Sequence, residues 1–140
     1  ERTILQELRR QFPKDLLELR VDANGAFDAA TANHVLYELA ELDIHSIEQP
    51  IKAGNLEAIS KLCRQTPTPI ALDEELIGVV NTEQKKQLLE EIKPQYIILK
   101  PSLVGGFSGS DEWIYLAEKQ NIGWWITSVL ESNIGLNAIA

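Results

Sequence analysis

The sequence has 140 residues, a length that fits one domain, and its apolar and charged fractions of 44% and 24% are those of a globular protein. Its formal net charge of −8 argues against nucleic-acid binding, which usually requires a basic face. No apolar run approaches the roughly 18 residues of a membrane span, and no signal peptide opens the chain. We therefore expect a cytoplasmic protein with no nucleic-acid or membrane partner.

Two residue types are unusual in number. Cys63 is the single cysteine, which excludes an internal disulfide and suits a reducing compartment. It lies within a helical pattern, and we interpret it as a buried, inert thiol. Methionine is absent, and Glu1 falls inside a helical pattern with no cap before it. We therefore expect this chain to be a piece of a longer protein.

Helical and extended patterns alternate along the chain. The patterns predict helices at residues 2–12, 28–42, 55–64, 82–93 and from 110 onward, and strands at residues 16–21, 44–48, 69–73, 95–100 and 123–128. One helix followed by five βα units predicts an α/β fold with a parallel sheet. Two architectures compete: an open, doubly wound sheet of flavodoxin type, and part of a (β/α)8 barrel, which five units cannot close. The uncapped first helix and the missing methionine favour the partial barrel.

Polar residues, four of them charged, end successive predicted strands at nearly constant intervals. Asp22, Glu48, Asp73, Lys100 and Ser128 are separated by 26, 25, 27 and 28 residues. The carboxyl ends of parallel strands meet at one rim of a sheet, so these side chains should gather there. Three carboxylates at one place need a cation, because unpaired like charges repel or take up protons. Oxygen ligands alone indicate a hard ion such as Mg²⁺.

Each acid also has a simpler explanation. Asp22 by itself could cap the following turn, where Asp is common, and Asn24 could face the same side two residues later. Glu48 is harder to explain in this way, because Glu is depleted in strands. Glu74 and Glu75 can be explained as solvated acids of a loop. Three acids at matched offsets favour a shared metal site over three coincidences.

Two further segments have open interpretations. Lys100 ends an apolar run, and either reaches from the rim into water or acts as a catalytic acid or base, or as a cation beside a developing anion. Ser128, Glu131 and Ser132 follow the last predicted strand and could hold a substrate carboxylate. Ordinary helix capping by Ser132 or Asn133 explains the same residues.

The remaining polar features are assigned to structure. His34 and His45 have no metal-ligand partner at close spacing. The VGGFSG segment does not match the G-x-G-x-x-G nucleotide-binding pattern, so we expect its glycines to allow a close backbone approach.

Taken in order, these motifs resemble the enolase superfamily, and within it the o-succinylbenzoate synthase branch of the muconate-lactonizing-enzyme-like subgroup. The motifs are RVDANGAF, SIEQP, ALDEE, ILKPSLVGG and ITSVLESNIGLNAIA, and they extend from Leu16 to Ala140. The resemblance implies that residues 1–140 form strands three to seven of a (β/α)7β barrel domain, without the N-terminal capping domain and the remaining strands.

The resemblance also implies roles for the strand-end residues. Asp22, Glu48 and Asp73 would be the Mg²⁺ ligands, and Lys100 would be the catalytic lysine of the sixth strand. The substrate-binding residues would be Asn24, Ser128, Glu131 and Ser132.

For the full-length parent, the resemblance implies Mg²⁺-dependent dehydration of a succinyl-hydroxycyclohexadiene carboxylate to o-succinylbenzoate through an enediolate, in menaquinone biosynthesis. The family's second-strand lysine would precede Glu1, so the 140 residues alone are expected to be inactive. One alternative within the superfamily is a dipeptide epimerase or N-acylamino acid racemase, in which Lys100 would be a second acid or base. A receiver module of flavodoxin type is the alternative from another class, but receivers place the Ser/Thr strand before the Lys strand, whereas Lys100 precedes Ser128 here. The oligomeric state is left open.

Overall fold

The computed structural model describes residues 2–140, and Glu1 lies outside the described part. The elements in chain order are α1 (Arg2–Gln11), β1 (Arg20–Asp22), α2 (Ala29–Ala40), β2 (Ser46–Glu48), α3 (Leu56–Gln65), β3 (Ile70–Leu72), the 3-10 turn η1 (Glu74–Leu76), α4 (Thr82–Ile92), β4 (Tyr96–Leu99), α5 (Pro101–Val104), α6 (Gly106–Lys119), β5 (Gly123–Ile126) and α7 (Asn133–Ile139). Within residues 2–140, no helix is both long and apolar enough to cross a membrane.

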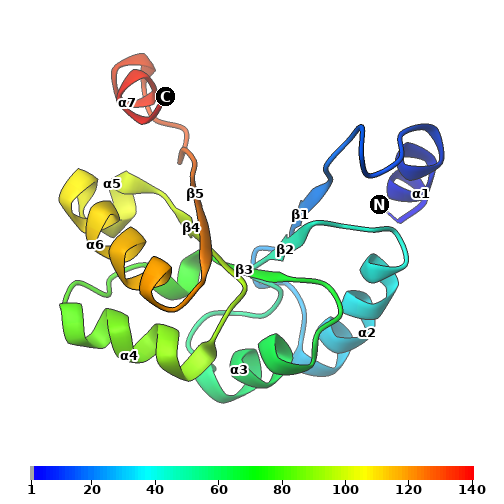
Figure 1. Ribbon diagram of the computed structural model, residues 1–140, viewed down its shortest axis with the longest axis horizontal. Coiled ribbons are helices and arrows are strands. Elements are labelled where there is room, and N and C mark those ends of the chain that lie inside the picture. Colours follow the sequence, from blue (N-terminus) through cyan, green and yellow to red (C-terminus); the bar gives the residue numbers. More distant parts are fainter. Residues whose placement is uncertain (1) are drawn as a thin grey trace.

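The five strands form one parallel sheet in the order β1-β2-β3-β4-β5. Consecutive helices pack against one another, α2 on α3, α3 on α4 and α4 on α6. Figure 1 shows these helices outside the strands, along an arc that is open between α1 and α7. This arrangement confirms the predicted partial barrel. The doubly wound alternative required the order 2-1-3-4-5 with helices on both faces, and is excluded.

The sheet is strongly curved, so that side chains from its two edge strands meet. The guanidinium carbon of Arg20 on β1 lies 4.1 Å from the ring centroid of Trp125 on β5. In a flat sheet these strands would be about 19 Å apart, at about 4.8 Å per step. The Trp125 ring is 5.5 Å from that of Tyr96, which is 4.9 Å from that of His45. We call Arg20, His45, Tyr96 and Trp125 the aromatic floor.

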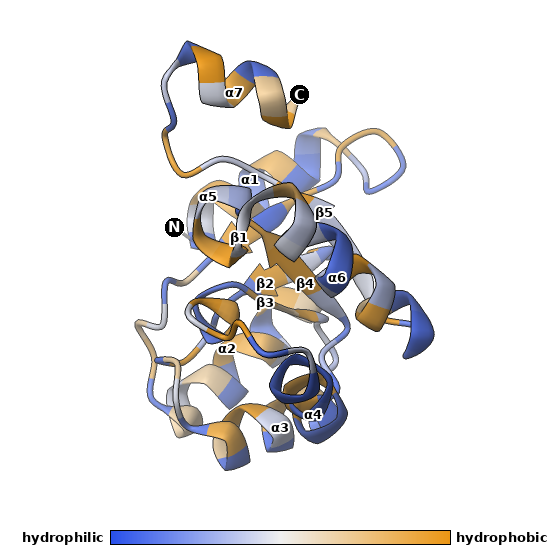
Figure 2. Cartoon of the chain, turned by 90° about the vertical axis from the view of Figure 1, so that its left-hand side faces the viewer, coloured by the Kyte–Doolittle hydropathy of each residue, from blue (hydrophilic) through white to orange (hydrophobic). Residues whose placement is uncertain are grey.

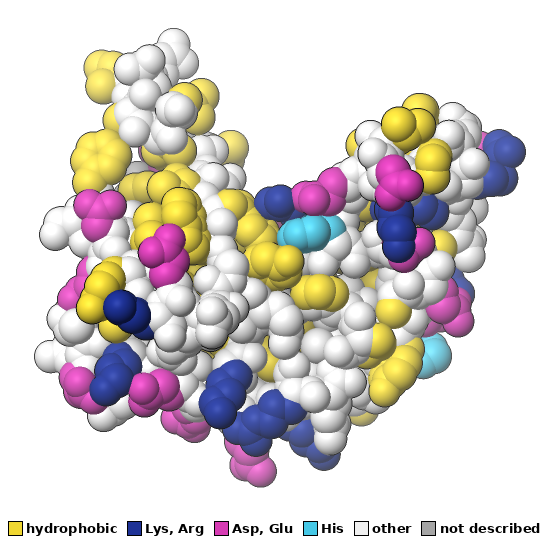
Figure 3. Space-filling model, viewed as in Figure 1, with side chains coloured by type: hydrophobic (Ala, Val, Ile, Leu, Met, Phe, Trp, Pro, Cys, Tyr) yellow, Lys and Arg dark blue, Asp and Glu magenta, His cyan; other side chains and the backbone are white. Residues whose placement is uncertain are grey.

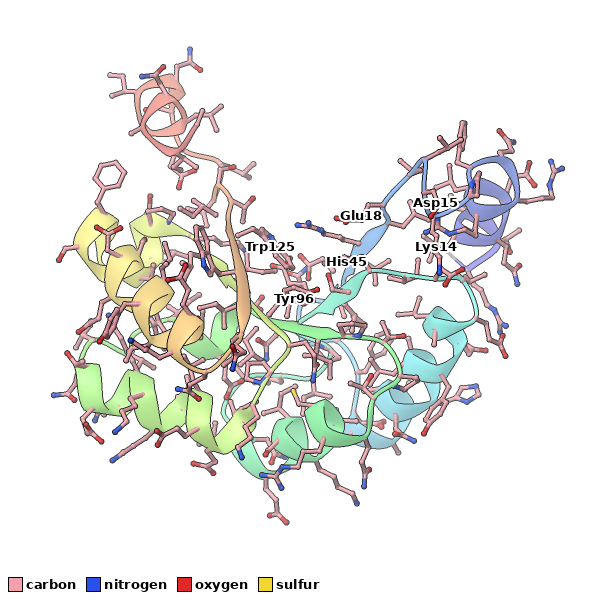
Figure 4. All side chains as sticks on the ribbon, viewed as in Figure 1. Lys14, Asp15, Glu18, His45, Tyr96 and Trp125 are labelled. Carbon is pink, nitrogen blue, oxygen red and sulfur yellow. The ribbon has the colours of Figure 1, made fainter. Side chains whose placement is uncertain are left out.

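The aromatic floor lies in the concave side of the arc. In Figure 4, His45, Tyr96 and Trp125 point toward the space between β1 and β5, with Glu18 beside them. The space-filling view is hollowed at the same place, between the arms that carry α1 and α7 (Figure 3). His45 and Arg20 both pair with Glu18, at 3.9 Å and 2.7 Å. Both histidines therefore have structural surroundings, since His34 is exposed on α2 near Glu38.

The core lies between the convex face of the sheet and the inner faces of the helices. Figure 2 shows apolar strands at the centre and polar outer helix faces. Burying each large apolar side chain contributes about 1.5–3 kcal/mol. The fully buried members include Leu36, Ile47, Ile59, Ile70, Leu72, Leu89, Ile97 and Trp113. This core fixes the strands relative to one another, and therefore fixes the rim at which they end.

Side-chain caps begin three helices where the sequence predicts them. Asp28, Asn55 and Asn81 accept hydrogen bonds from the backbone N–H groups of Thr31, Ala58 and Glu83, at 2.7, 3.2 and 2.9 Å. Such caps satisfy N–H groups that the first helical turn leaves unpaired.

Helix α6 begins four residues earlier than the sequence predicts. Gly105 has a φ of 101°, a left-handed conformation that turns the chain into α6, and Ser110 donates to the carbonyl of Gly106 at 2.8 Å from inside the helix. A Cβ on Gly109 would lie 2.1 Å from the carbonyl oxygen of Val104. The glycine-rich segment therefore provides a close backbone approach, as expected.

Candidate metal and substrate site

Four consecutive strands place a charged residue at the same rim of the sheet. Asp22 and Glu48 end β1 and β2 and are register partners in the parallel ladder. Asp73 directly follows β3, and Lys100 directly follows β4. Because the strands are parallel and staggered only slightly, their carboxyl ends bring these side chains to one side of the molecule.

Lys100 lies between two of the acids. Its ammonium nitrogen is 3.2 Å from Oε1 of Glu48 and is also hydrogen-bonded to the carboxylate of Asp73. The side chains of Lys100, Glu48 and Asp73 are only 16%, 18% and 5% exposed. Lys100 therefore does not reach out into water, which was the simpler interpretation of this residue.

Burial and crowding shift the titration of this cluster. Burial raises the pKa of Glu48 to about 7, with a further increase from the charge of Asp22, and the hydrogen bond from Lys100 offsets only part of this. Burial also disfavours the ammonium of Lys100, but contacts with Asp73 and Glu48 outweigh it and raise the Lys100 pKa. The rim therefore holds more negative charge than one lysine neutralises.

Asp22 combines its position at the rim with a local role. Its Oδ1 accepts a hydrogen bond of 2.8 Å from the backbone N–H of Asn24, which has a left-handed φ of 47°. Asp22 therefore does cap the turn that follows it. Asn24 contacts Asp22 through its backbone, and a substrate contact by the Asn24 side chain stays a prediction.

The segment after β5 is tied to the region around Lys100. Glu131 accepts hydrogen bonds of 2.8 Å from the hydroxyl of Ser102 and from the backbone N–H of Val129. Ser132 immediately precedes α7, although its side chain makes no capping hydrogen bond. Substrate contacts by Ser128, Glu131 and Ser132 stay predictions.

The whole chain, residues 1–140, matches the family model described as enolase C-terminal domain-like. The chain belongs to this family. It is 52% identical to o-succinylbenzoate synthase of Desulfotalea psychrophila over 140 residues, which are 100% of this chain and 38% of that protein. It is also 34% identical to N-succinylamino acid racemase of Thermus thermophilus, over 94% of this chain and 34% of that protein.

Solved structures agree with these relatives. The fold matches MenC from Desulfotalea psychrophila with a TM-score of 0.95 at 52% identity, over 99% of this chain and 39% of that one. A dipeptide epimerase from Enterococcus faecalis matches with a TM-score of 0.87 at 26% identity, over 99% of this chain and 40% of that one. The resemblance to the enolase superfamily is confirmed, and the chain spans about two fifths of the length of these relatives.

The carboxylates of Asp22, Glu48 and Asp73 are suitable ligands for a hard cation. In the structure, however, they are not arranged around a common point as metal ligands are. Within residues 2–140, no three acid, histidine or cysteine side chains are placed as a group that could hold a metal ion. The ammonium of Lys100 bridges Glu48 and Asp73 instead. Three carboxylate side chains are nevertheless the ligands that Mg²⁺ prefers. Burial, followed by the charge of Asp22, raises the pKa of Glu48, and a bound cation would stabilise its ionised form.

Three polar residues near the rim were not recognised from the sequence as parts of a site. Glu75 is only 7% exposed, so its interpretation as a solvated loop acid is wrong. Gln49, next to Glu48, is fully buried and hydrogen-bonds to Glu75. Burial raises the pKa of Glu74, as does the charge of Asp73, and its Oε2 is buried with no hydrogen-bond partner among the described residues. The signal available was the run of acids after β3.

Proposed function

We propose that the longer protein containing this chain is a Mg²⁺-dependent o-succinylbenzoate synthase, a lyase of the cytoplasm that serves menaquinone biosynthesis. It would dehydrate a small-molecule carboxylate, a succinyl-hydroxycyclohexadiene carboxylate. The observation that carries the chemistry is the rim of Asp22, Glu48 and Asp73, with Lys100 between two of them. The substrate is supported by the 52% identity to an o-succinylbenzoate synthase along the whole chain, against 34% to the racemase.

In this proposal Asp22, Glu48 and Asp73 hold the Mg²⁺. When bound, Mg²⁺ supplies positive charge for oxyanion character that develops on the substrate carboxylate. Lys100, paired with Glu48 and Asp73, would contribute a second positive charge, and its raised pKa keeps it an ammonium. Asn24, Ser128, Glu131 and Ser132 are proposed to orient the substrate.

The overall reaction balances without a redox partner. The proton α to the carboxylate leaves, the neighbouring carbon loses its hydroxyl group, and the two depart as water while the ring becomes aromatic. No side chain of this chain is assigned as the base that removes the α proton. The strand that carries this base in the family was expected to lie outside the 140 residues.

The test is the formation of o-succinylbenzoate by the purified full-length protein, followed by the ultraviolet absorbance of the aromatic product. We expect turnover with Mg²⁺, its loss after chelation, and its recovery on adding Mg²⁺ back. Glu48→Gln and Asp73→Asn should abolish turnover, whereas Lys61→Ala, at an exposed position on α3, should not. Absence of product in the presence of Mg²⁺ would reject the proposal.

Racemisation or epimerisation is the second candidate, and the similarity to N-succinylamino acid racemase favours it. Lys100 would then exchange a proton with the substrate instead of supplying charge alone. Incubating the full-length protein with an N-succinylamino acid in deuterated water distinguishes the two. Rapid exchange of the α proton without any dehydration activity would select the racemase.

A further inference from the structure

Gln49 uses every hydrogen-bonding group of its side chain. The residue is fully buried and has a left-handed φ of 36°. Its Oε1 accepts from the backbone N–H groups of Asp73 and Glu75, at 3.2 and 3.4 Å. Its Nε2 donates to the carbonyl of Ile51 at 3.0 Å and to Oε2 of Glu75 at 3.1 Å. An amide with two acceptor and two donor sites is thereby completely satisfied.

The backbone of Gln49 joins the loop after β1 to β3. Its N–H donates to the carbonyl of Ala71 on β3 at 2.9 Å, and its carbonyl accepts from the N–H of Gly25 at 2.7 Å. Gly25 has a φ of 69°, and a Cβ there would lie 2.9 Å from the Cα of Lys52. The loop after β1 can therefore lie this close to the Ile51–Lys52 backbone of the loop after β2 only because residue 25 is glycine.

Glu75 is the buried counterpart of Gln49. Its Oε1 accepts from the backbone N–H of Gly54 at 2.9 Å, and its Oε2 accepts from Gln49. A buried carboxylate without partners would be strongly destabilising, and these two donors compensate its lost hydration. The pair therefore connects the loops that follow β1, β2 and β3, which are the loops adjoining Asp22, Glu48 and Asp73.

We propose that Gln49 and Glu75 are positioning residues, which fix the backbone segments that carry Glu48 and Asp73 so that these carboxylates can bind a hard cation. This inference rests on the metal site of the proposed function. Lys100 bridges the side chains of Glu48 and Asp73, and the Gln49–Glu75 network links the backbone segments from which these two side chains extend. Mg²⁺ demands near-ideal octahedral geometry, so small displacements of its ligands weaken binding. Groups that orient metal ligands typically affect metal affinity about 10- to 100-fold.

The test is the dissociation constant for Mg²⁺ of the full-length protein, measured by isothermal titration calorimetry for a double-mutant cycle. Gln49→Glu removes the donor and sets two carboxylates against each other, whereas Glu75→Gln sets two amide donors against each other. We expect each to weaken binding about 10- to 100-fold. The double variant Gln49→Glu/Glu75→Gln restores one donor and one acceptor at the same net charge, so it should recover most of the affinity.

Gln95 supplies a matched control. Its Oε1 accepts from the N–H of Ile70 at 2.9 Å and its Nε2 donates to the carbonyl of Cys63 at 2.9 Å, at the opposite end of β3. Gln95→Glu should lower the thermal midpoint of the ion-free protein while leaving the Mg²⁺ dissociation constant unchanged. If Gln95→Glu loses as much Mg²⁺ affinity as Gln49→Glu does, the Gln49–Glu75 network affects Mg²⁺ binding only through the stability of the fold, and the positioning role is rejected.

The outcomes separate the two levels of proposal. If the unsubstituted protein binds no Mg²⁺, the metal site of the proposed function fails, and this inference fails with it. If the unsubstituted protein binds Mg²⁺ and the single variants bind it equally well, only the positioning role is overturned. Affinity losses that simply add in the double variant would also overturn it, because coupled residues must deviate from additivity.

Discussion

Replacing Lys100 by alanine in the full-length protein should lower kcat by at least about 100-fold, because removing one preorganised partner of a developing charge typically has that effect. In the structure this ammonium contacts the Glu48 carboxylate at 3.2 Å and also binds Asp73, so its loss leaves these two carboxylates without their paired cation. The same contact is one of the influences that lower the pKa of Glu48. Its pKa, already about 7, should therefore rise further in Lys100→Ala.

The assay is the rate of o-succinylbenzoate formation at saturating Mg²⁺ between pH 6 and pH 9. The plateau of the profile should be lower in Lys100→Ala, and the rise in the Glu48 pKa should be measured separately, by titrating chelator-treated protein. Lys100→Arg should restore activity if charge alone is needed, and fail to do so if Lys100 transfers a proton, because guanidinium hardly deprotonates. Lys61→Ala is the exposed-lysine control. Turnover by Lys100→Ala close to that of the unsubstituted protein would refute a catalytic role.

Three further predictions concern stability and reactivity. Because the pKa of Glu48 is raised in the fold from 4.5 to about 7, chelator-treated protein should lose stability to urea as pH rises from 5 to 7, and Glu48→Gln should flatten this dependence. Burial raises the pKa of Cys63 from 9.0 to about 12, so at pH 8 its reaction with a disulfide reagent should be about 1000-fold slower than in denatured protein. Gly109→Ala should destabilise the fold by about 1–3 kcal/mol or more in chemical denaturation, because the added methyl would meet the carbonyl of Val104.

The order of elements could be predicted because each strand is a short apolar run bounded by turn residues. The strand boundaries were less accurate. The sequence pattern predicts the first strand at residues 16–21, but β1 begins at Arg20, where its pairing with Ser46 of β2 starts. Leu16 is 76% exposed and its N–H bonds to the carbonyl of Pro13 in a turn. The strand-like sequence pattern extends past the residues that pair with β2. The pattern alone cannot show where this pairing begins.

The charged rim could be predicted for a related reason. A repeat of one strand and one helix brings residues at similar offsets to the same edge, so Asp22, Glu48, Asp73 and Lys100 were found from their spacing. The network behind them could not be found in this way. Gln49 reaches the N–H of Asp73 and the carboxylate of Glu75 across 24 and 26 residues, through side-chain geometry that leaves no periodic trace. From the sequence alone, Glu75 is expected to be solvated because it lies in a run of acids, and only the structure shows its buried partner Gln49.

The aromatic floor and the charged rim belong to the same face of the sheet, and the rim includes Glu48, whose pKa is raised. Side chains two residues apart on a strand point to the same side, so Arg20 lies beneath Asp22 along β1, and Tyr96 lies four residues before Lys100 along β4. Across the concave side, the Trp125 ring lies 5.5 Å from the Tyr96 ring and 4.1 Å from the guanidinium carbon of Arg20. Burial is the largest influence that raises the pKa of Glu48, and the charge of Asp22 is the next. A carboxylate that burial has partly deprived of hydration gains more from a nearby cation than a fully hydrated one would, so the Glu48 position favours cation binding.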